Sequence, residues 1–269
     1  MERERRRLQY LEAMGIQVWV PRSSPPQFGK LETPAWGETE SFPSLQQENR
    51  HTETGRAPPL SSYSREPPAP AILHSADANV TLTPPTAGLD WNELEMCVRN
   101  CTTCALHRTR TQTVFGVGNR SASWMVIGEA PGEQEDLKGE PFVGRAGQLL
   151  NEMLRAIGLS RAEVYIANVL KCRPPRNRDP TEEEADACEA FLKRQVALIS
   201  PRIILATGRI AAQNLLRTAT AIGKLRGNVY RYQDIPLVVT YHPAYLLRSP
   251  GEKRKAWEDL RLAERTFRA

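Results

Sequence analysis

Beyond residue 90 the chain alternates between short apolar runs and longer amphipathic stretches. The apolar runs are rich in β-branched residues and have no polar face, as expected of strands buried on both sides of a parallel sheet. They lie at residues 124–128, 164–168, 203–207 and 237–241. Helical spacing of apolar residues is found at about 145–157, 181–198, 209–217 and 251–267. This alternation predicts an α/β fold of three layers, in which helices cover both faces of a central four-stranded parallel sheet.

The first 90 residues show a different pattern. From about Pro21 to Pro85 the chain is rich in Pro, Ser, Thr and Glu, and its few apolar residues follow no period. Such a segment buries too little apolar surface to offset the entropy lost on ordering, so residues 21–90 are predicted to be a disordered linker. The folded domain is predicted to span residues 91–269.

Residues 1–20 are predicted to form a short docking element at the end of this linker. Leu8, Leu11 and Met14 recur at helical spacing, Gly15 can end that helix, and "IQVWV" alternates like a short strand. The pattern resembles the N-terminal peptide of the psi subunit of the replicative clamp loader, which docks on the chi subunit. The resemblance implies a replication or repair protein as partner. The alternative is an amphipathic end that folds back on its own domain.

Charge and cysteine usage narrow the setting in which the protein works. The 269 residues carry a net charge of +5 and the pI is about 9.0, which modestly favours a polyanionic partner such as nucleic acid. The N-terminal "MERERRRLQY" is charged where a secretion signal needs an apolar run, and no apolar stretch reaches the roughly 18–20 residues of a membrane span. We therefore expect a cytoplasmic protein, in which clustered thiols bind metal more readily than they form disulfides.

Five cysteines are present, and three of them stand close together in "CVRNCTTC". Cys97, Cys101 and Cys104 have C-x3-C-x2-C spacing, which matches the cluster loop of radical-SAM enzymes. The C-x2-C pair can also supply half of a four-thiolate site, completed by the distant Cys172 and Cys188. Four thiolates can hold a [4Fe–4S] cluster or a zinc ion, and ligand count alone does not separate the two metals.

Three of the four predicted strands run into polar loops rich in Gly or Pro. The loops read "EAPGEQEDLKGEPFVGRAG", "VLKCRPPRNRDP" and "HPAYLLR", whereas the third strand is followed by "GRIAAQ", an ordinary helix start. Ligands of open parallel sheets bind beyond the carboxyl ends of the strands. Three such loops at one edge of the sheet predict an active-site cleft there.

These loops also resemble those of a known family. "GEAPGEQED", "PFVGRAG", "NVLKCRPPRNR" and "YHPAYLLR", with "CTTCALHRTR" upstream, resemble the family 4 uracil-DNA glycosylases, which hold a [4Fe–4S] cluster. The motifs agree in order and spacing over about residues 93–265. The resemblance implies a monomeric enzyme that flips uracil out of single- or double-stranded DNA. Hydrolysis of the N-glycosidic bond then leaves an abasic site, the first step of base excision repair.

The resemblance also implies a set of metal ligands, which are Cys101, Cys104, Cys172 and Cys188. Cys97 is left over, and its place about one helical turn before Cys101 predicts a small buried side chain packed near the cluster. The radical-SAM interpretation is weaker because it leaves the two distant cysteines unexplained. It also usually has an aromatic residue before the last cysteine, where this chain has Thr103, and it needs a much longer fold.

By the same resemblance, three residues grip the flipped base. Phe142, in "EPFVG", offers a ring on which a planar base can stack. Asn168, at a strand end, offers an amide whose donor and acceptor match O4 and N3–H of uracil, whereas cytosine presents the opposite pattern. His242, at the head of "HPAYLLR", can donate to O2, where negative charge develops as uracil leaves. Asn168 and His242 are both predicted to be catalytic.

The "GEAPG" loop and the residues after it are predicted to complete the pocket with Glu129, Ala130, Gly132, Glu135 and Asp136. Better-known uracil glycosylases have an Asp at the third position of this motif, where it orients the attacking water. This chain has Ala130 there, and family 4 commonly has a small residue. The water-positioning group is therefore left open among the three carboxylates. Glu129 is the predicted catalytic one, and Glu135 is also predicted beside C5 of uracil.

The residues after His242 are predicted to contact DNA. Leu246 or Leu247 can wedge into the stack that the extruded base leaves, with Arg248 on a phosphate. The same rim carries further positive charge, which predicts salt-sensitive binding. These basic residues are Lys138, Arg145, Arg173, Arg176 and Arg178.

Other functions are weighed against the glycosylase. A non-enzymatic iron–sulfur DNA-binding module would keep the cysteines and the basic rim but has no use for Phe142, Asn168 and His242 around one pocket. A replication-associated adaptor would work through residues 1–20 and have a vestigial domain. A phosphate-ester enzyme fits poorly, because "GEAPGEQED" is acidic and has no Lys after its glycines.

Overall fold

The structure, a computed structural model, describes residues 86–269 together with Leu8 and Glu12, which are both helical. Apart from Leu8 and Glu12, the predicted docking element lies outside the described residues, as does nearly all of the predicted linker, so both stay predictions. Thr86 precedes the first helix of the domain and donates its hydroxyl to the Ala190 carbonyl at 3.2 Å. The last residues that the sequence assigned to the linker therefore contact the domain.

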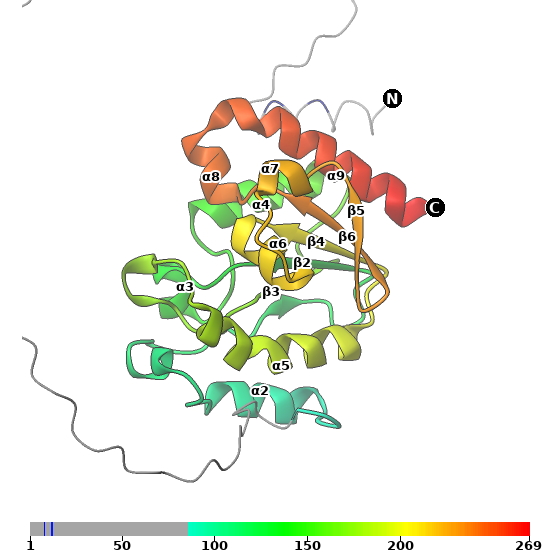
Figure 1. The fold of residues 1–269 in the computed structure, drawn as a ribbon. Helices are drawn as coiled ribbons and strands as arrows, with labels where there is room; N and C mark the ends of the chain where they lie inside the picture. Colours follow the sequence, from blue (N-terminus) through cyan, green and yellow to red (C-terminus); the bar gives the residue numbers. More distant parts are fainter. Residues whose placement is uncertain (1–7, 9–11, 13–85) are drawn as a thin grey trace, which may run out of the picture. The chain divides into compact units, whose positions relative to one another are not determined.

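A six-stranded sheet forms the middle layer, in the order β1-β3-β2-β4-β6-β5 (Figure 1). Its four central strands are parallel and coincide with the four apolar runs, which confirms that prediction. They are β2 Trp124–Gly128, β3 Tyr165–Asn168, β4 Ile203–Thr207 and β6 Ile235–Thr240. Every residue of β2, β3 and β4 is buried, which explains why these strands are apolar on both faces.

Two antiparallel edge strands extend the sheet beyond the prediction. They are β1 Val117–Gly118, paired with β3, and β5 Val229–Tyr232, paired with β6. β1 is too short to show a period. β5 forms a hairpin with β6 through Gln233 and Asp234, whose φ angles of 47° and 65° are those of a turn matched to strand twist. An edge strand with one solvated face lacks the continuous apolar run of a central strand.

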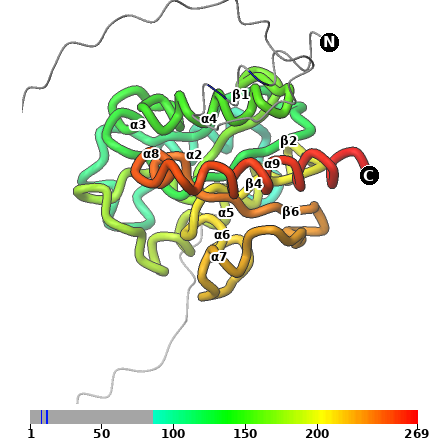
Figure 2. The backbone as a smooth tube through the Cα atoms, turned by 90° about the horizontal axis from the view of Figure 1, so that it is seen from above, coloured from blue at the N-terminus to red at the C-terminus, as the bar shows by residue number. Residues whose placement is uncertain are grey.

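Helices cover both faces of the sheet, as Figures 1 and 2 show from two directions, and the three-layer prediction is confirmed. On one face α4 and α9 pack against side chains such as Val126 and Leu205. On the other, α5 and α6 pack against Ile127 and Ala206, because neighbouring residues of a strand point to opposite layers. None of the described helices is long and apolar enough to cross a membrane. The helices are α2 Trp91–Arg99, α3 Glu133–Lys138, α4 Arg145–Ala156, α5 Glu182–Ile199, α6 Arg209–Leu216, α7 Ile222–Leu225, α8 Pro243–Arg248 and α9 Lys253–Arg268.

Helix α2 contacts α5 and buries Leu94 and Val98. A capping box fixes its start: Asp90 accepts from the Glu93 N–H at 2.9 Å, and the Glu93 carboxylate accepts from the Asp90 N–H at 2.8 Å. Cys97 is exposed, so the prediction that it is a buried side chain near the cluster is wrong. It precedes Val98 by one residue and therefore points about 100° around the helix from the buried side.

Candidate functional site

A cleft of about 700 Å³ opens at the carboxyl ends of the parallel strands. The loops after β2, β3 and β6 line it, and the start of α6 after β4 adds Gly208 and Arg209. Asp136, Leu246 and Leu247 are not among the lining residues. The predicted residues that do line it are Glu129, Ala130, Gly132, Glu135, Phe142, Asn168, Arg178, His242 and Arg248.

The structure brings Phe142, Asn168 and His242 together. Gly128 and Asn168 are register partners at the ends of β2 and β3. A Cβ atom added to Gly128 would lie 2.4 Å from Asn168 Oδ1 and 2.7 Å from the Phe142 ring, so only glycine leaves room for both side chains. The Phe142 and His242 ring centroids are 5.5 Å apart with an interplanar angle of 26°. Three side chains that are far apart in the sequence therefore face one space.

Asn168 presents an unused hydrogen-bond acceptor to this space. Its side chain is buried, and its Oδ1 atom has no hydrogen-bond partner among the described residues. Leaving a buried acceptor unpaired costs about 1–3 kcal/mol, so proteins keep few of them. An acceptor kept free in a cleft fits a ligand that donates a hydrogen bond.

His242 is a neutral donor with its tautomer fixed by the backbone. It is the N-cap residue of α8, and its Nδ1 atom accepts from the Ala244 N–H at 3.1 Å. The proton of the neutral ring is therefore on Nε2. Burial, and next the charge of Arg248, lower the pKa of the imidazole to about 4, so the ring is uncharged at pH 7.

The loop that carries Phe142 is clamped from two sides. Phe142 has a φ of 55°, a strained conformation for a residue with a side chain. The Arg161 guanidinium donates to the Phe142 carbonyl at 3.3 Å and to the carbonyl before it. Glu135 Oε1 accepts from the N–H groups of the next two residues at 3.0 and 3.1 Å. Together these contacts hold the aromatic ring at the cleft.

Glu129 has the carboxylate in the cleft best suited to proton transfer. Burial, and next the charge of Asp179, raise its pKa to about 7, which Arg209 partly opposes. Arg209 pairs with Asp179 at 2.5 Å beside the same cleft. Ala130 follows Glu129 and has no polar side chain. A carboxylate with a pKa near neutrality can accept a proton at physiological pH.

The other two acids of this loop are engaged by the backbone. Asp136 is buried away from the cleft and accepts from the Thr111 N–H at 2.9 and 3.0 Å. Glu135 lines the cleft, but besides the two bonds to the Phe142 loop it accepts from the Gly132 N–H at 3.1 Å. Both carboxylates therefore hold local structure, which leaves Glu129 as the acid available to a water molecule.

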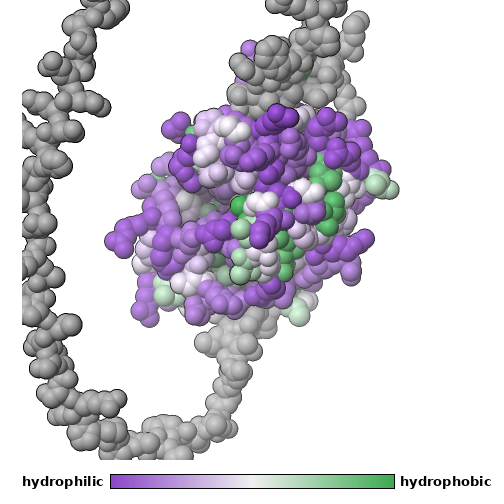
Figure 3. Space-filling view, turned by 45° about the horizontal axis from the view of Figure 1, so that its top comes forward, coloured by the Kyte–Doolittle hydropathy of each residue, from purple (hydrophilic) through white to green (hydrophobic). Residues whose placement is uncertain are grey.

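Helix α8 directs its two leucines in different directions. Leu246 is 1% exposed and packs in the core beside α4, whereas Leu247 is 36% exposed. Only Leu247 is therefore accessible to a DNA duplex. The surface of the domain is largely hydrophilic on the face shown in Figure 3.

The predicted basic rim is only partly free. Arg178 is bonded to Glu184 by two contacts of 2.8 and 2.6 Å, and Arg173 donates to Asn177 Oδ1 at 2.7 Å. Both residues stabilise the loop between β3 and α5, and these hydrogen bonds fix the positions of their guanidinium groups. The side chains of Lys138, Arg145 and Arg176 are exposed.

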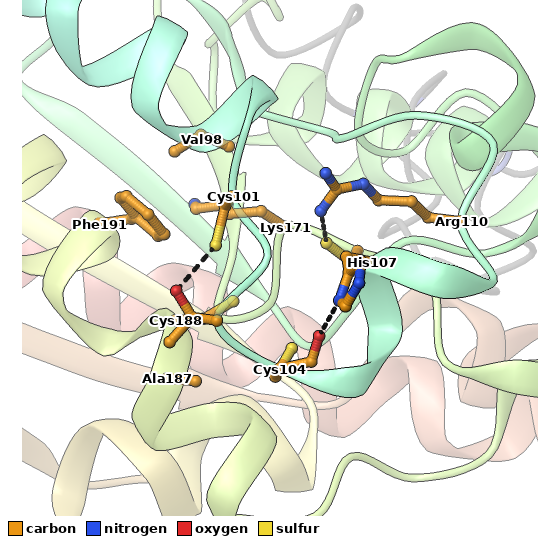
Figure 4. A pocket seen from close by; sticks show the side chains of 11 residues that line it. Val98, Cys101, Cys104, His107, Arg110, Lys171, Ala187, Cys188 and Phe191 are labelled. Carbon is orange, nitrogen blue, oxygen red and sulfur yellow. Dashed lines mark hydrogen bonds between the residues drawn. The ribbon is translucent and has the colours of Figure 1, made fainter. Parts of the chain in front are cut away.

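Four cysteines converge on a second, small pocket about 10 Å³ in volume, which Figure 4 shows from close by. They come from three places: the segment after α2, the loop after β3, and α5. All of them have free thiols. The four are Cys101, Cys104, Cys172 and Cys188, the set that the resemblance implied, and the exposed Cys97 does not line this pocket.

Positive side chains border the thiol pocket. Arg110 Nη1 donates to Cys172 Sγ at 3.0 Å, and the side chain of Lys171 is buried beside it. Burial raises the pKa of the Cys188 thiol to about 12 and lowers the pKa of the Lys171 amine to about 7. Metal ligation requires thiolates, and the nearby cations offset part of their charge. The donor set and its surroundings therefore fit a thiolate metal site.

Two residues that support the site are not marked by any pattern in the sequence. Arg161 clamps the Phe142 loop from the segment before β3, and no motif marks it. Lys171 lies inside "NVLKC", where a basic residue looks like one more surface charge, yet it is 1% exposed. Only their burial and hydrogen bonds distinguish them from the many other basic residues in the chain.

Residues 115–261 match the family model described as the uracil DNA glycosylase superfamily, so the chain belongs to that class of proteins. The chain is 46% identical to the type-4 uracil-DNA glycosylase of Archaeoglobus fulgidus over 172 residues, 61% of this chain and 86% of that protein. It is 42% identical to the type-4 enzyme of Pyrobaculum aerophilum over 180 residues, 64% of this chain and 92% of that one. The chain belongs to the type-4 family of uracil-DNA glycosylases.

Proposed function

We propose that the protein removes uracil from DNA by hydrolysing the N-glycosidic bond, which leaves an abasic site. Membership of the type-4 family supports this reaction. The observation that carries the proposal is the Asn168 Oδ1 atom, which has no partner in the described domain and is buried in a cleft that also contains the Phe142 ring and the His242 imidazole. N3–H of uracil supplies the donor that this acceptor lacks. The reaction is the first step of base excision repair.

The three side chains then have separate roles. The flipped uracil stacks on Phe142, while the Asn168 amide accepts from N3–H and donates to O4. His242 donates from Nε2 to O2, where negative charge develops as the bond to the sugar breaks. Because the backbone already fixes the neutral imidazole, the donor needs no reorganisation during the reaction.

Glu129 positions the attacking water in this proposal. Ala130 has no polar side chain, and the carboxylates of Glu135 and Asp136 accept hydrogen bonds from the backbone. Glu129 lines the cleft with a pKa of about 7, and no backbone N–H of the described residues donates to its carboxylate. As a carboxylate it orients the water and accepts its proton as the new bond to the sugar forms.

Replacing Glu129 by glutamine is expected to lower kcat about 100-fold, the lower end of the range for losing a general base. In the wild type, kcat should fall as the pH drops below about 7, because protonation of Glu129 removes the base. The variant has no group to protonate there and should lose this acidic limb. The measurement is kcat on a uracil-containing oligonucleotide across the pH range, and an unchanged limb in the variant would contradict the assignment.

The same substitution is expected to stabilise the fold. The pKa of Glu129 rises from 4.5 to about 7 on folding, so the folded state binds the proton more tightly and loses stability as the pH rises through this window. At pH 8 the glutamine variant should therefore gain about 1–2 kcal/mol in the free energy of unfolding, after allowance for partial exposure. Urea denaturation at pH 8 and at pH 4 tests this, and the gain should vanish at the lower pH.

We also propose that Cys101, Cys104, Cys172 and Cys188 hold a [4Fe–4S] cluster. No three His, Cys, Asp or Glu side chains within the described ranges are arranged for a single ion, whereas a cluster accepts thiolates that are farther apart. When bound, the cluster cross-links the segment after α2, the loop after β3 and α5. The proposed hydrolysis uses none of its redox chemistry. Zinc is the alternative metal, and binding this single ion would require the same thiols to move closer together.

Replacing Cys188 by serine is expected to abolish stable cluster binding, because Cys188 is a buried member of the thiol set. Anaerobically purified protein should lose its iron, its acid-labile sulfide and its broad visible absorption, and its melting temperature should fall. Cys97→Ser is the matched control, and its iron content should equal that of the wild type, because Cys97 lies outside the pocket. A colourless wild-type protein that contains zinc would refute the iron–sulfur assignment.

The proposed DNA contacts follow from exposure. Leu247 wedges into the stack, and Arg248, which lines the cleft, contacts a phosphate. Binding to single- or double-stranded DNA should weaken as salt increases. We further propose that the protein is a cytoplasmic monomer and that residues 1–20 dock on a replication or repair protein.

A glycosylase assay tests the proposed function. Wild-type protein is incubated with oligonucleotides that carry a single uracil, both single-stranded and in duplex, and abasic sites are counted after alkaline cleavage. Matched oligonucleotides with cytosine or thymine at the same position should stay intact. DNA binding without cleavage would instead indicate a non-enzymatic module. An effect in cells that is lost on deletion of residues 1–20 but survives His242→Ala would indicate an adaptor.

A further inference from the structure

Lys171 lies between the thiol pocket and the end of β3 that carries Asn168. Its side chain is buried, and it lines the thiol pocket beside Cys172 and Cys188. Its ammonium donates to the Asn168 carbonyl at 2.8 Å and to Gln195 Oε1 at 2.6 Å. A buried ammonium is tolerated only where hydrogen bonds and opposite charges offset its lost hydration. The position of the Lys171 side chain therefore depends both on the thiol pocket and on its two hydrogen-bond acceptors.

Hydrogen bonds also tie the short segment from Asn168 to Cys172 to the end of β2 and to the chain before β1. The N–H groups of Val169 and Leu170 donate to the carbonyls of Gly128 and Glu129 at 2.9 and 3.0 Å. The Lys171 carbonyl accepts from the Val114 N–H at 2.8 Å. Because these hydrogen bonds restrain the segment along its length, a displacement at Cys172 is transmitted toward Asn168.

We propose that Lys171 is a positioning residue that couples occupancy of the thiol site to uracil recognition by Asn168. The inference rests on the proposed function. A filled thiol site restrains Cys172 and Cys188, which line the same pocket as Lys171, and the Lys171 amine in turn donates to the Asn168 carbonyl. The peptide plane after Asn168 is thereby held, and with it the direction of the Asn168 side chain. When the thiol site is empty, Cys172 and Cys188 lose this restraint and the amide is less well oriented.

The coupling has to act in both directions. If an occupied thiol site strengthens uracil binding, bound uracil must stabilise the occupied thiol site by the same factor. A purely structural lysine, which merely fills the space between α5 and the sheet, would predict no such dependence. The proposal can therefore be tested in metal-loaded protein, with readouts other than excision.

The first measurement is the dissociation constant of free uracil for metal-loaded wild type and Lys171→Met, which has a similar length and no donor. The variant is expected to bind uracil at least tenfold more weakly, while its affinity for DNA containing an abasic site changes less than twofold. Leu154→Ala, a core truncation in α4 remote from this segment, controls for lost stability and should leave uracil affinity unchanged. Equal uracil affinities in Lys171→Met and wild type would overturn the proposal.

The second measurement is the rate at which a chelator removes the metal, with and without saturating uracil. Uracil should slow the loss severalfold in wild type and have no effect in Lys171→Met. If Lys171→Met retains no metal, the test moves to Gln195→Met, which keeps the lysine and every cysteine but removes one acceptor of the ammonium. There the protection by uracil should fall at least twofold, and unchanged protection would refute the coupling.

The two proposals fail in different ways. Wild-type protein that leaves uracil-containing DNA intact refutes the glycosylase, whatever Lys171 does. Wild-type protein that excises uracil, with equal protection of the metal in wild type and the lysine variant, refutes only the coupling. Metal analysis of the same samples shows whether the coupled group contains iron or zinc.

Discussion

Replacing His242 by alanine is expected to lower kcat for uracil excision about 100- to 1000-fold. A preorganised donor to developing negative charge contributes about 3–4 kcal/mol to transition-state stabilisation. We propose that His242 is such a donor, because its ring lines the cleft and the Ala244 N–H occupies Nδ1, which leaves the proton on Nε2. KM should change much less than kcat, because the charge on O2 develops only as the bond breaks.

The pH dependence separates this role from proton transfer by a charged imidazole. The pKa of His242 is about 4, so the ring stays neutral above pH 5 and the His242→Ala variant should keep the wild-type acidic limb near pH 7. His242→Gln restores an uncharged donor and should recover part of the lost rate. Arg155→Ala, on the exposed side of α4, controls for effects of mutagenesis and purification and should leave kcat unchanged. A kcat within threefold of wild type for His242→Ala would refute the assignment.

Replacing Asn168 by leucine is expected to lower kcat/KM about 100- to 1000-fold and to weaken binding of free uracil. Leucine has nearly the same size but offers neither the acceptor for N3–H nor the donor for O4. Burying uracil against an apolar side chain leaves two of its polar atoms unpaired, at about 1–3 kcal/mol each. The measurements are kcat/KM on uracil-containing DNA and the dissociation constant of uracil.

The stability of this variant provides the sharper test. Because Asn168 Oδ1 is buried without a partner among residues 86–269, its replacement should raise the free energy of unfolding by about 1 kcal/mol in the uracil-free protein. Loss of activity together with a gain in stability is expected of a group kept for a ligand. Loss of both would mean that the amide supports the fold, and the proposed recognition of uracil would then fail.

The sequence was most informative about the central strands and least about the edges and the supports. Runs such as 124–128 and 203–207 are apolar throughout because both of their faces are covered, and this signal is local. One face of β5 is exposed, so its residues do not form a continuous apolar run, and the sequence pattern does not predict this strand. The exposure of Cys97 and the burial of Leu246 could not be predicted from spacing, because each depends on which side of a short helix meets the core.

By itself, the sequence determined the α/β alternation and the edge of the sheet where the polar loops gather, and it predicted the residues of a uracil pocket and a thiolate site. The first two follow from local periodicity and from the rule that parallel strands end at one edge, and the predicted residues follow from the resemblance of the motifs to those of the type-4 family. The tertiary structure decided which groups are free to act. Within the described part of the chain it leaves Asn168 Oδ1 unpaired, sets the His242 tautomer, engages Glu135 and Asp136 with backbone amides, and buries Lys171 between the thiols and β3. Burial and hydrogen-bond partners come from segments distant in the chain, and no local pattern encodes them.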